Sequence, residues 1–340
     1  METDPPVLPH PPPLDPAWLA HEIAADLLAP KPAIDPVARQ PIYAAECRVR
    51  NATLLAGGAR DHRLSEGVNT KSITLPSSGD EYAVPVLQYD RSGTSGEVGW
   101  VIVYYHGGGL LVGEADSEDL SCRRLVKDTA AFLPSCRAYS VGYRLKPQHR
   151  AQTCLNDCID AFTALAHLHT SAKIIVVGSS SGGELAALVT QHALRAGIPF
   201  HGVLLRCPVT SDAFRGLDYV PEQFQHMHTS AQNPAFQTSL FSRLDMDGPR
   251  DGLERMPLET EVEELKNMPR TWVQVCTNDA LYSDGACYVK LLRDAGVEVG
   301  VDVVVGWPHT FWLKAPHLDR ALEAEEAMIQ GLRWVAAVRE

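Results

Sequence analysis

Ser180 lies in a run of small residues, Gly-Ser-Ser-Ser-Gly-Gly at positions 178–183. This spacing is typical of a serine nucleophile raised at the tip of a sharp turn between a strand and a helix. Such a turn is crowded, and only residues without a Cβ fit two positions before and two positions after the serine. Gly178 and Gly182 meet this demand, so we predict that Ser180 is a nucleophile.

The flanking sequence indicates the strand and the helix that would hold this turn. Residues 174–177 are Ile-Ile-Val-Val, a β-branched run suited to a buried parallel strand. Apolar residues then recur at helical spacing over 185–189. The N-terminus of such a helix presents free N–H groups and the positive end of its dipole, which favour an anion beside Ser180. A flexible Gly/Ser loop is the alternative, and the strand and helix patterns argue against it.

A second glycine-rich segment follows the strand-like run 101–105. It reads His106-Gly107-Gly108-Gly109, and three consecutive glycines cost backbone entropy. A need for bare N–H groups directed at a ligand explains them better than a plain glycine-rich turn, which is the alternative. We expect these groups to bind the oxygen that becomes negative when Ser180 attacks a carbonyl.

Five motifs follow one another along the chain. They are His106-Gly107-Gly108-Gly109, Tyr143-Arg144-Leu145-Lys146-Pro147-Gln148-His149, Gly178-Ser179-Ser180-Ser181-Gly182-Gly183, Asn278-Asp279-Ala280-Leu281 and Trp307-Pro308-His309-Thr310-Phe311. With these motifs in this order, the chain from about Val101 to the C-terminus resembles the hormone-sensitive-lipase-like carboxylesterases of the α/β-hydrolase fold. Five ordered matches are far more specific than any one of them.

The resemblance implies a catalytic triad of Ser180 as nucleophile, Asp279 as orienting acid and His309 as base, in the chain order of α/β-hydrolases. The local sequence agrees, because Asp279 and His309 each follow a strand-like run, at 272–276 and 301–305. A serine hydroxyl is a poor nucleophile, so an imidazole must take its proton and a carboxylate must hold that imidazole in the right tautomer. The alternatives are a turn or helix-capping role for Asp279 and an ordinary loop histidine at position 309.

The same resemblance assigns the oxyanion hole to the backbone N–H groups of Gly108, Gly109 and Ser181. Gly107 then allows the loop to approach, and we interpret His106 as the residue that shapes it. One such donor is typically worth about a hundred- to a thousandfold in rate. No cofactor is implied, because the glycine segments lack both the lysine of a phosphate-binding loop and the three-glycine spacing of a dinucleotide site.

Six positions depart from the family pattern, and none of them removes a triad side chain. The family usually has Asp at 179, Ala at 181, Glu at 148, Pro at 280, Asn at 184 and Gly at 310, where this chain has Ser179, Ser181, Gln148, Ala280, Glu184 and Thr310. The loss of carboxylates at positions 148 and 179 alters the electrostatics around the site and bears on the pH optimum and the reaction type.

The composition favours a cytoplasmic enzyme. With 340 residues, 45% of them hydrophobic, the chain can bury a large core. Its net charge of −12 argues against nucleic acid or an anionic membrane as a partner. Eight scattered cysteines predict free thiols in a reducing compartment and no metal site, since Cys154 and Cys158 lack nearby ligand pairs. A homodimer is compatible with this fold.

Eight β-type runs predict the organisation of the chain, and from the third onward they alternate with helical stretches. We expect an α/β-hydrolase fold with a mostly parallel, eight-stranded, doubly wound sheet and a helical cap. Residues 61–208 and 269–340 would form the catalytic core, residues 1–60 an N-terminal arm with cap helices at 17–28 and 34–45, and residues 209–268 a cap insertion. The charged run 259–266 is expected to be a solvated helical face. The β-type runs lie near 71–74, 82–88, 100–105, 137–143, 173–177, 202–206, 271–276 and 298–304.

These features together predict a serine carboxylic ester hydrolase that acts through an acyl-Ser180 intermediate on short-chain or acetyl esters. Residues 104–114 are similar to fungal esterase-like proteins of natural-product pathways, which suggests a polyketide-like small molecule as substrate. A triad-dependent cyclase or acyl-transfer and release enzyme is the main alternative. A non-catalytic small-molecule receptor is a third, but such relatives typically lose the histidine that His309 supplies here.

Overall fold

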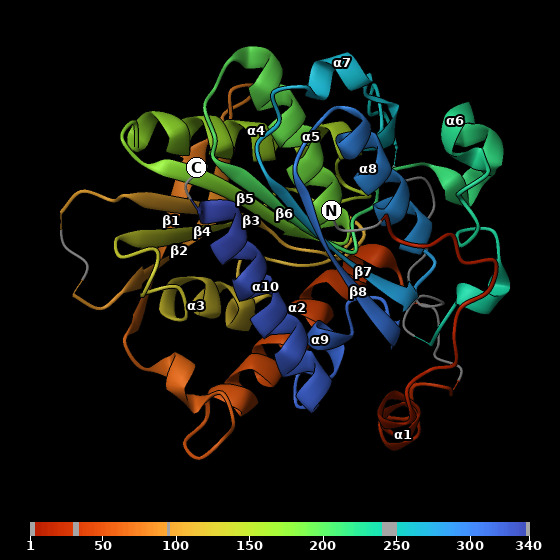
Figure 1. Ribbon diagram of the computed structural model, residues 1–340. Helices are drawn as coiled ribbons and strands as arrows, with labels where there is room; N and C mark the ends of the chain where they lie inside the picture. Colours follow the sequence, from red (N-terminus) through yellow and green to blue (C-terminus); the bar gives the residue numbers. More distant parts are fainter. Residues whose placement is uncertain (1–3, 30–33, 94–95, 240–249, 338–340) are drawn as a thin grey trace.

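A computed structural model describes residues 4–29, 34–93, 96–239 and 250–337 (Figure 1). Within these residues, eight strands form one sheet in the order β1-β2-β4-β3-β5-β6-β7-β8. Strand β2 runs antiparallel to both of its neighbours, and every other neighbouring pair is parallel. The predicted eight-stranded, mostly parallel sheet of an α/β-hydrolase is therefore confirmed. The strands are β1 Val68–Pro76, β2 Ala83–Arg91, β3 Trp100–Tyr105, β4 Cys136–Val141, β5 Lys173–Ser179, β6 Gly202–Arg206, β7 Thr271–Asn278 and β8 Val299–Pro308.

Helices cover both faces of this sheet (Figure 1). Helices α4, α5 and α8 lie on one face, and α3 and α10 lie on the other. Among the described residues, none of the helices combines the length and the apolar content that a membrane span requires. The helices are α1 Pro16–Ala24, α2 Pro36–Leu55, α3 Asp119–Lys127, α4 Ala151–Leu168, α5 Ser181–Ala196, α6 Glu222–Gln225, α7 Val262–Leu265, α8 Tyr282–Asp294, α9 Phe311–Lys314 and α10 Asp319–Ala336.

The two faces of the sheet have separate hydrophobic cores because successive side chains of a strand point to opposite sides. In β3, Val101, Val103 and Tyr105 pack into the core beneath α4, α5 and α8. Ile102 and Tyr104 face the other way, into the core beneath α3 and α10. Strands buried on both faces must be apolar throughout, which explains why β3 and β5 could be found in the sequence as continuous apolar runs.

The strand register places the two glycine-rich segments side by side. Tyr105, the last residue of β3, pairs with Gly178 of β5, so both strands end at the same level of the sheet. The segment that follows β3 therefore begins beside the turn that follows β5. Strands β7 and β8 are further along the same parallel sheet and end at the same edge, which brings their terminal loops toward this point.

The helices of the two predicted cap segments have other bounds than the sequence suggested. Helix α1 ends at Ala24 because Asp26 adopts a left-handed conformation with φ of 49°, whereas α2 continues to Leu55. In the described parts of the insertion, α6 and α7 have four residues each, and residues 240–249 lie outside the described part of the chain. The run 259–266 is not simply a solvated face, since Leu265 of α7 is fully buried.

Parts of both predicted cap segments lie on the side of the molecule toward which β7 and β8 point. Helices α1 and α6 are both on that side of the molecule (Figure 1). The proline-rich arm follows the same edge, because Asn278 Nδ2 donates a hydrogen bond to the Pro12 carbonyl oxygen at 2.7 Å. Tyr282, in the first turn of α8, likewise donates to the Pro6 carbonyl oxygen at 2.6 Å. The arm therefore packs against the exits of the strands that carry the candidate site.

Candidate active site

Ser180 is held in a strained turn between β5 and α5. Its φ of 55° and ψ of −124° are rarely adopted by a residue with a side chain. A Cβ added to Gly178 would lie 2.1 Å from the Gly182 carbonyl oxygen, and a Cβ added to Gly182 would lie 2.1 Å from the Tyr105 carbonyl oxygen. Neither position can accept a side chain, which is the physical reason for the two flanking glycines. Strain of this kind costs roughly 1–3 kcal/mol and is found where function requires the geometry.

The structure brings Ser180, His309 and Asp279 into one hydrogen-bonded chain. His309 Nε2 lies 2.8 Å from Ser180 Oγ, and His309 Nδ1 lies 2.7 Å from Asp279 Oδ2. Asp279 follows the end of β7 and His309 follows the end of β8, so adjacent strands deliver the two side chains. All three residues are buried. This is the arrangement in which an imidazole removes a proton from a serine hydroxyl while a carboxylate fixes its tautomer.

The surroundings of His309 make its imidazole a stronger base. Burial lowers the pKa of His309, but the negative charge of Asp279 and the hydrogen bond to it raise the pKa, and Cys207 adds to this effect. The net pKa is above the ordinary value of 6.5. A base with a raised pKa accepts the serine proton more readily, provided that it starts in its neutral form.

Cys207 is a neighbour of the candidate triad that the sequence analysis did not identify. Its thiol, a carboxylate oxygen of Asp279 and a ring nitrogen of His309 all lie within 4.8 Å of one another. Burial raises the pKa of Cys207, yet hydrogen bonds to Cys276 and His309 lower it, with a net value of about 7. These donors could hold a soft metal ion, but such an ion would compete for the Asp279–His309 hydrogen bond. No motif in the sequence marked Cys207, because it lies in none of the five.

The glycine-rich segment after β3 is shaped by close backbone packing. Gly108 has φ of 128°, and a Cβ there would lie 2.0 Å from the Val112 carbonyl oxygen. Gly109 also has a positive φ, 65°. The Leu110 N–H donates to Ser181 Oγ at 3.3 Å, which ties this segment directly to the turn that holds Ser180.

His106 supports the segment from beneath. Its ring stacks on Tyr143, with ring centroids 4.3 Å apart, and the Tyr143 hydroxyl donates to the His106 carbonyl oxygen at 2.6 Å. Burial lowers the pKa of His106 to about 4, so the ring is neutral. Its Nδ1 lies 2.8 Å from the Gly107 carbonyl oxygen, which the neutral ring can contact as a donor. These contacts give His106 a structural place in the loop and keep it outside the chain of Ser180, His309 and Asp279.

Three backbone N–H groups near Ser180 are available to a ligand. Among the described residues, the N–H groups of Gly108, Gly109 and Ser181 donate to no protein atom. Ser181 is the first residue of α5, where the N–H groups of a helix are unpaired by geometry and carry the positive end of its dipole. The three groups that the sequence assigned to an oxyanion hole are therefore unoccupied by the protein itself.

Two of the departures from the family pattern are buried beside the site. The Ser179 hydroxyl donates to the carboxylate of Glu118, whose two oxygens both lie 2.7 Å from it, so a carboxylate is present near position 179 after all. Glu184, in the first turn of α5, is buried, and within the described residues neither of its carboxyl oxygens has a hydrogen-bond partner. Burial raises its pKa well above the usual 4.5, which favours the neutral acid.

Comparison with known proteins identifies the family of this chain. Residues 102–313 match the family described as having the alpha/beta hydrolase fold. The chain is 32% identical over 285 residues to an FAD-linked oxidoreductase, pytB, of Aspergillus terreus, but spans only 32% of that protein and 79% of itself. It is 26% identical to a versiconal hemiacetal acetate esterase of Dothistroma septosporum, covering 68% of this chain and 71% of the relative.

The solved structures show the same fold. An esterase of Pyrobaculum calidifontis superposes with a TM-score of 0.72 at 24% identity, over 96% of this chain and 100% of the esterase. At 24% identity, this structural similarity shows the fold alone. The family match, in contrast, covers more than half of the chain and includes the segment after β3, Ser180, Asp279 and His309. The chain therefore belongs to the hormone-sensitive-lipase-like family of the α/β-hydrolase fold.

Proposed function

We propose that this protein is a serine carboxylic ester hydrolase that acts through an acyl-Ser180 intermediate. The observation that carries the proposal is the pair of distances about His309, 2.8 Å from Nε2 to Ser180 Oγ and 2.7 Å from Nδ1 to Asp279 Oδ2. The family and the esterases among its relatives support ester hydrolysis as the reaction.

The proposed reaction has two halves that use the same residues. Ser180 Oγ attacks the ester carbonyl carbon while His309 Nε2 takes the hydroxyl proton, and the carbonyl oxygen becomes an oxyanion. His309 then gives this proton to the departing alcohol, leaving the acyl group on Ser180. A water molecule attacks the acyl carbon with His309 again as base, which releases the acid and restores the Ser180 hydroxyl. Asp279 stabilises the imidazolium in both halves.

The oxyanion would be bound by the unpaired N–H groups of Gly108, Gly109 and Ser181. Backbone donors fixed by packing do not reorganise as the charge develops, and each is worth about a hundred- to a thousandfold in rate. The position of Ser181 at the N-terminus of α5 adds the favourable end of the helix dipole. The sequence assigned these three residues by resemblance, and their free N–H groups support that assignment.

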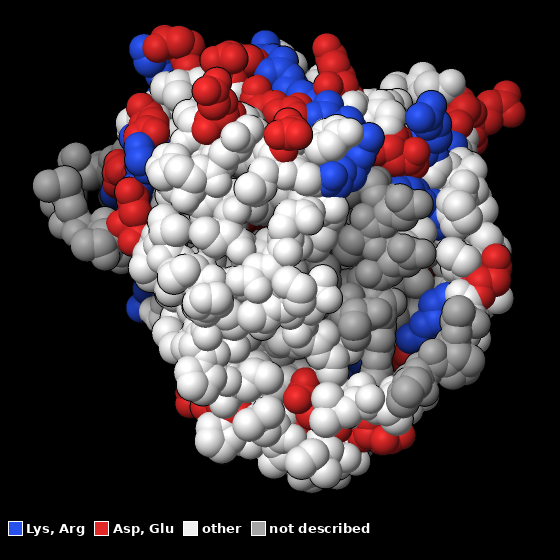
Figure 2. Space-filling model, turned by 90° about the vertical axis from the view of Figure 1, so that its right-hand side faces the viewer, with Lys and Arg blue, Asp and Glu red and all other residues white. Residues whose placement is uncertain are grey.

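We further propose short-chain or acetyl esters as the substrate class, among them an acetylated natural-product intermediate. A relative named for an acetate ester of a hemiacetal supports both the acyl group and the kind of molecule. On the side toward which β7 and β8 point, the described residues in the middle of the face are uncharged, and Asp, Glu, Lys and Arg lie around its margins (Figure 2). Such a surface suits an uncharged small molecule rather than a charged one.

All eight cysteines are buried and unpaired. Free thiols persist in a reducing compartment, so we place the enzyme in the cytoplasm. The eight thiols support this proposal, and detection of the tagged protein in the cytosolic fraction would test it.

The test of the proposed reaction combines covalent labelling with turnover. Wild type, Ser180→Ala and the exposed-serine control Ser171→Ala would be treated with a fluorophosphonate and assayed on nitrophenyl esters from acetate to decanoate. We expect labelling and turnover of the short esters in wild type and in Ser171→Ala, and neither in Ser180→Ala. Wild-type protein that shows neither would refute the proposal and favour a receptor.

The same experiment separates hydrolysis from the alternative of cyclisation or acyl transfer. In that case Ser180 would react with the fluorophosphonate, but simple esters would not be hydrolysed. Mass analysis after incubation with candidate natural-product intermediates would then decide, because hydrolysis adds the elements of water across the ester bond and cyclisation does not. A product without added water would replace the hydrolase proposal with the alternative.

A further inference from the structure

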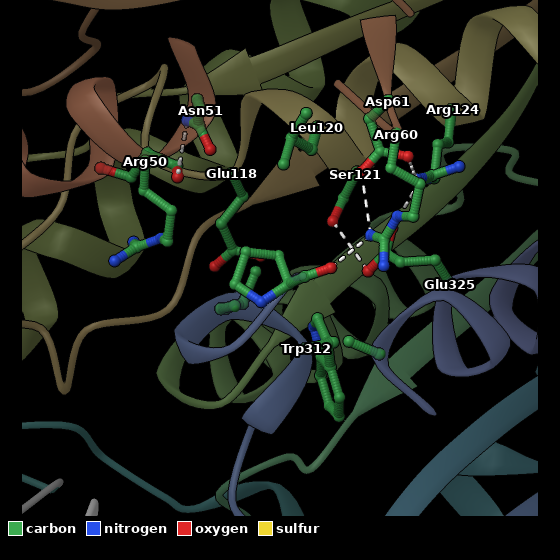
Figure 3. A pocket seen from close by; sticks show the side chains of 14 residues that line it. Arg50, Asn51, Arg60, Asp61, Glu118, Leu120, Ser121, Arg124, Trp312 and Glu325 are labelled. Carbon is green, nitrogen blue, oxygen red and sulfur yellow. Dashed lines mark hydrogen bonds and ion pairs between the residues drawn. The ribbon is translucent and has the colours of Figure 1, made fainter. Parts of the chain in front are cut away.

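Glu118 is a buried carboxylate beside the candidate active site that none of the motifs contains. It precedes α3, and its side chain does not cap that helix. Only 5% of the residue is exposed. Figure 3 shows Glu118 among the residues that line a small cavity of about 20 Å³, about the room that one water molecule needs. A carboxylate in such a place must be compensated by hydrogen bonds.

Three donors from two different parts of the site compensate Glu118. Oε1 accepts the Gly107 N–H at 2.7 Å and lies 2.7 Å from the Ser179 hydroxyl oxygen. Oε2 lies 2.7 Å from the same hydroxyl oxygen and accepts the hydroxyl of Tyr104. Gly107 belongs to the glycine-rich segment 106–109 after β3, called the oxyanion segment below, and Ser179 immediately precedes the nucleophile Ser180. One side chain therefore joins the loop that would bind the oxyanion to the turn that carries the nucleophile.

The backbone around Gly107 shows how closely these two segments are held. A Cβ at Gly107 would lie 3.0 Å from the Ser179 carbonyl oxygen, 3.2 Å from Ser180 Cβ and 3.4 Å from Glu118 Oε1. Little room exists for the loop to move toward Ser180, and the hydrogen bond to Glu118 resists movement away. Because the Gly107 N–H is engaged by Glu118, that group does not face the oxyanion, which leaves this role to the next residues of the loop.

The contact with Ser179 gives a physical meaning to a departure from the family pattern. The family usually has an aspartate at position 179, and this chain has a serine. Here the carboxylate comes from Glu118, which lies next to Ser179 in the fold, and the serine hydroxyl donates a hydrogen bond to it. Burial raises the pKa of Glu118 above its ordinary value, and the hydrogen bonds from Gly107, Tyr104 and Ser179 that fix the side chain offset part of this effect.

We propose that Glu118 is a positioning residue that sets the distance between the oxyanion segment and Ser180, and that it supplies the carboxylate that position 179 lacks. This inference rests on the proposed esterase function, since it assigns Glu118 a task in that reaction. Glu118 acts through the Gly107 peptide and Ser179, and it touches no reacting atom. Loss of Glu118 should therefore weaken binding of the transition state more than binding of the ester.

The first test compares Glu118→Ala with Glu114→Ala, an exposed glutamate of the same segment. For Glu118→Ala we expect kcat on nitrophenyl butyrate to fall between tenfold and about a thousandfold, the upper value being that of a lost oxyanion donor, with KM nearly unchanged. Glu114→Ala should keep both constants near those of wild type. A folded Glu118→Ala enzyme whose kcat stays within twofold of wild type would overturn the proposal.

The second test moves the carboxylate from position 118 to position 179. In wild type, Ser179→Asp places two carboxylates in contact and should lower kcat, because buried like charges repel. In the Glu118→Ala background the same change should raise kcat by about fivefold or more, the value of about one hydrogen bond. A purely structural role for Glu118 predicts no such reversal of sign. Loss of activity in both backgrounds would contradict the proposed exchange of carboxylates.

Glu118→Gln keeps the proposal testable if the alanine variant does not fold. Its amide retains one accepting oxygen for Gly107 but turns an NH2 group toward a hydroxyl, so kcat should fall about fivefold at constant KM. An unchanged kcat would overturn the proposal. Failure of the esterase function itself would be recognised separately, because wild type would then neither hydrolyse the ester nor react with a fluorophosphonate.

Discussion

Replacement of Asp279 by asparagine tests the role of the carboxylate with almost no change of shape. Asp279 accepts two hydrogen bonds, from the Leu281 N–H to Oδ1 at 2.9 Å and from His309 Nδ1 to Oδ2 at 2.7 Å. An asparagine has only one accepting oxygen. The Leu281 N–H cannot become an acceptor, so the amide oxygen stays with it and the NH2 group turns toward His309.

This exchange of partners forces His309 into the wrong tautomer. With a donor facing Nδ1, the neutral imidazole must carry its proton on Nε2, the nitrogen that lies 2.8 Å from Ser180 Oγ. A protonated Nε2 cannot accept the serine proton. By analogy with the aspartate-to-asparagine change in a serine protease triad, kcat of Asp279→Asn should fall about 10⁴-fold, which corresponds to roughly 5.4 kcal/mol of activation free energy.

The pH dependence of Asp279→Asn should move in a definite direction. In wild type, Asp279 raises the pKa of His309 above 6.5, and the neutral base is required, so the rate should rise with pH through that raised pKa. Without the carboxylate, burial still lowers the pKa, and the rise should occur at lower pH. The assay is kcat/KM on nitrophenyl butyrate from pH 5 to 10, with the exposed Asp218→Asn as control. A variant within tenfold of wild type, or a rise displaced to higher pH, would refute this reasoning.

Three further predictions concern buried groups and the tight turn. The pKa of buried Glu184 is raised, so the folded protein keeps a proton that the unfolded chain releases above about pH 4.5. The free energy of unfolding should therefore decline as pH rises toward the folded-state pKa, by up to ~1.4 kcal/mol per pH unit. Urea unfolding at pH 5 to 8 should show this decline in wild type and its absence in Glu184→Gln. Gly182→Ala should not yield active, folded enzyme, because the new Cβ would lie 2.1 Å from a backbone carbonyl of β3, whereas Gly99→Ala, where the nearest atom is 3.8 Å away, should leave the melting temperature nearly unchanged. Glu325→Ala leaves the fully buried Arg206 without its 2.7 Å ion-pair partner and should cost roughly 3–5 kcal/mol of unfolding free energy, and a loss below 1 kcal/mol would show that the pair is solvated.

The sheet could be predicted from the sequence because its central strands are short, apolar and continuous. Trp100–Tyr105 and Gly202–Arg206 form strands with the bounds that the sequence indicated. A parallel strand that is buried on both faces appears in the sequence as a continuous apolar run, which can be recognised without knowledge of the rest of the chain. The turn around Ser180 was predictable for a similar reason, since its steric demand selects glycine at fixed spacing.

The contacts around the site were less predictable because they join residues distant in sequence. Glu118 follows an aspartate and a serine, in a segment that reads as an exposed acidic turn, and only the fold turns its side chain toward Gly107 and Ser179. Cys207 is part of the site only because the fold brings it near His309, which is about a hundred positions later in the chain. The described parts of the insertion are less helical than expected because their polar, proline-containing sequence forms short turns that depend on packing against the core.

In the proposed reaction, Ser180 carries the acyl group during turnover. The most direct measurement is to quench the enzyme with acid during hydrolysis of nitrophenyl acetate and to map acetylated peptides by mass spectrometry, with Ser180→Ala in parallel. We expect an acetyl group on Ser180 of wild type, and neither acetylation at this position nor turnover in Ser180→Ala. Turnover that persists in Ser180→Ala, or an acetyl group that accumulates on another residue during turnover, would contradict the proposed reaction.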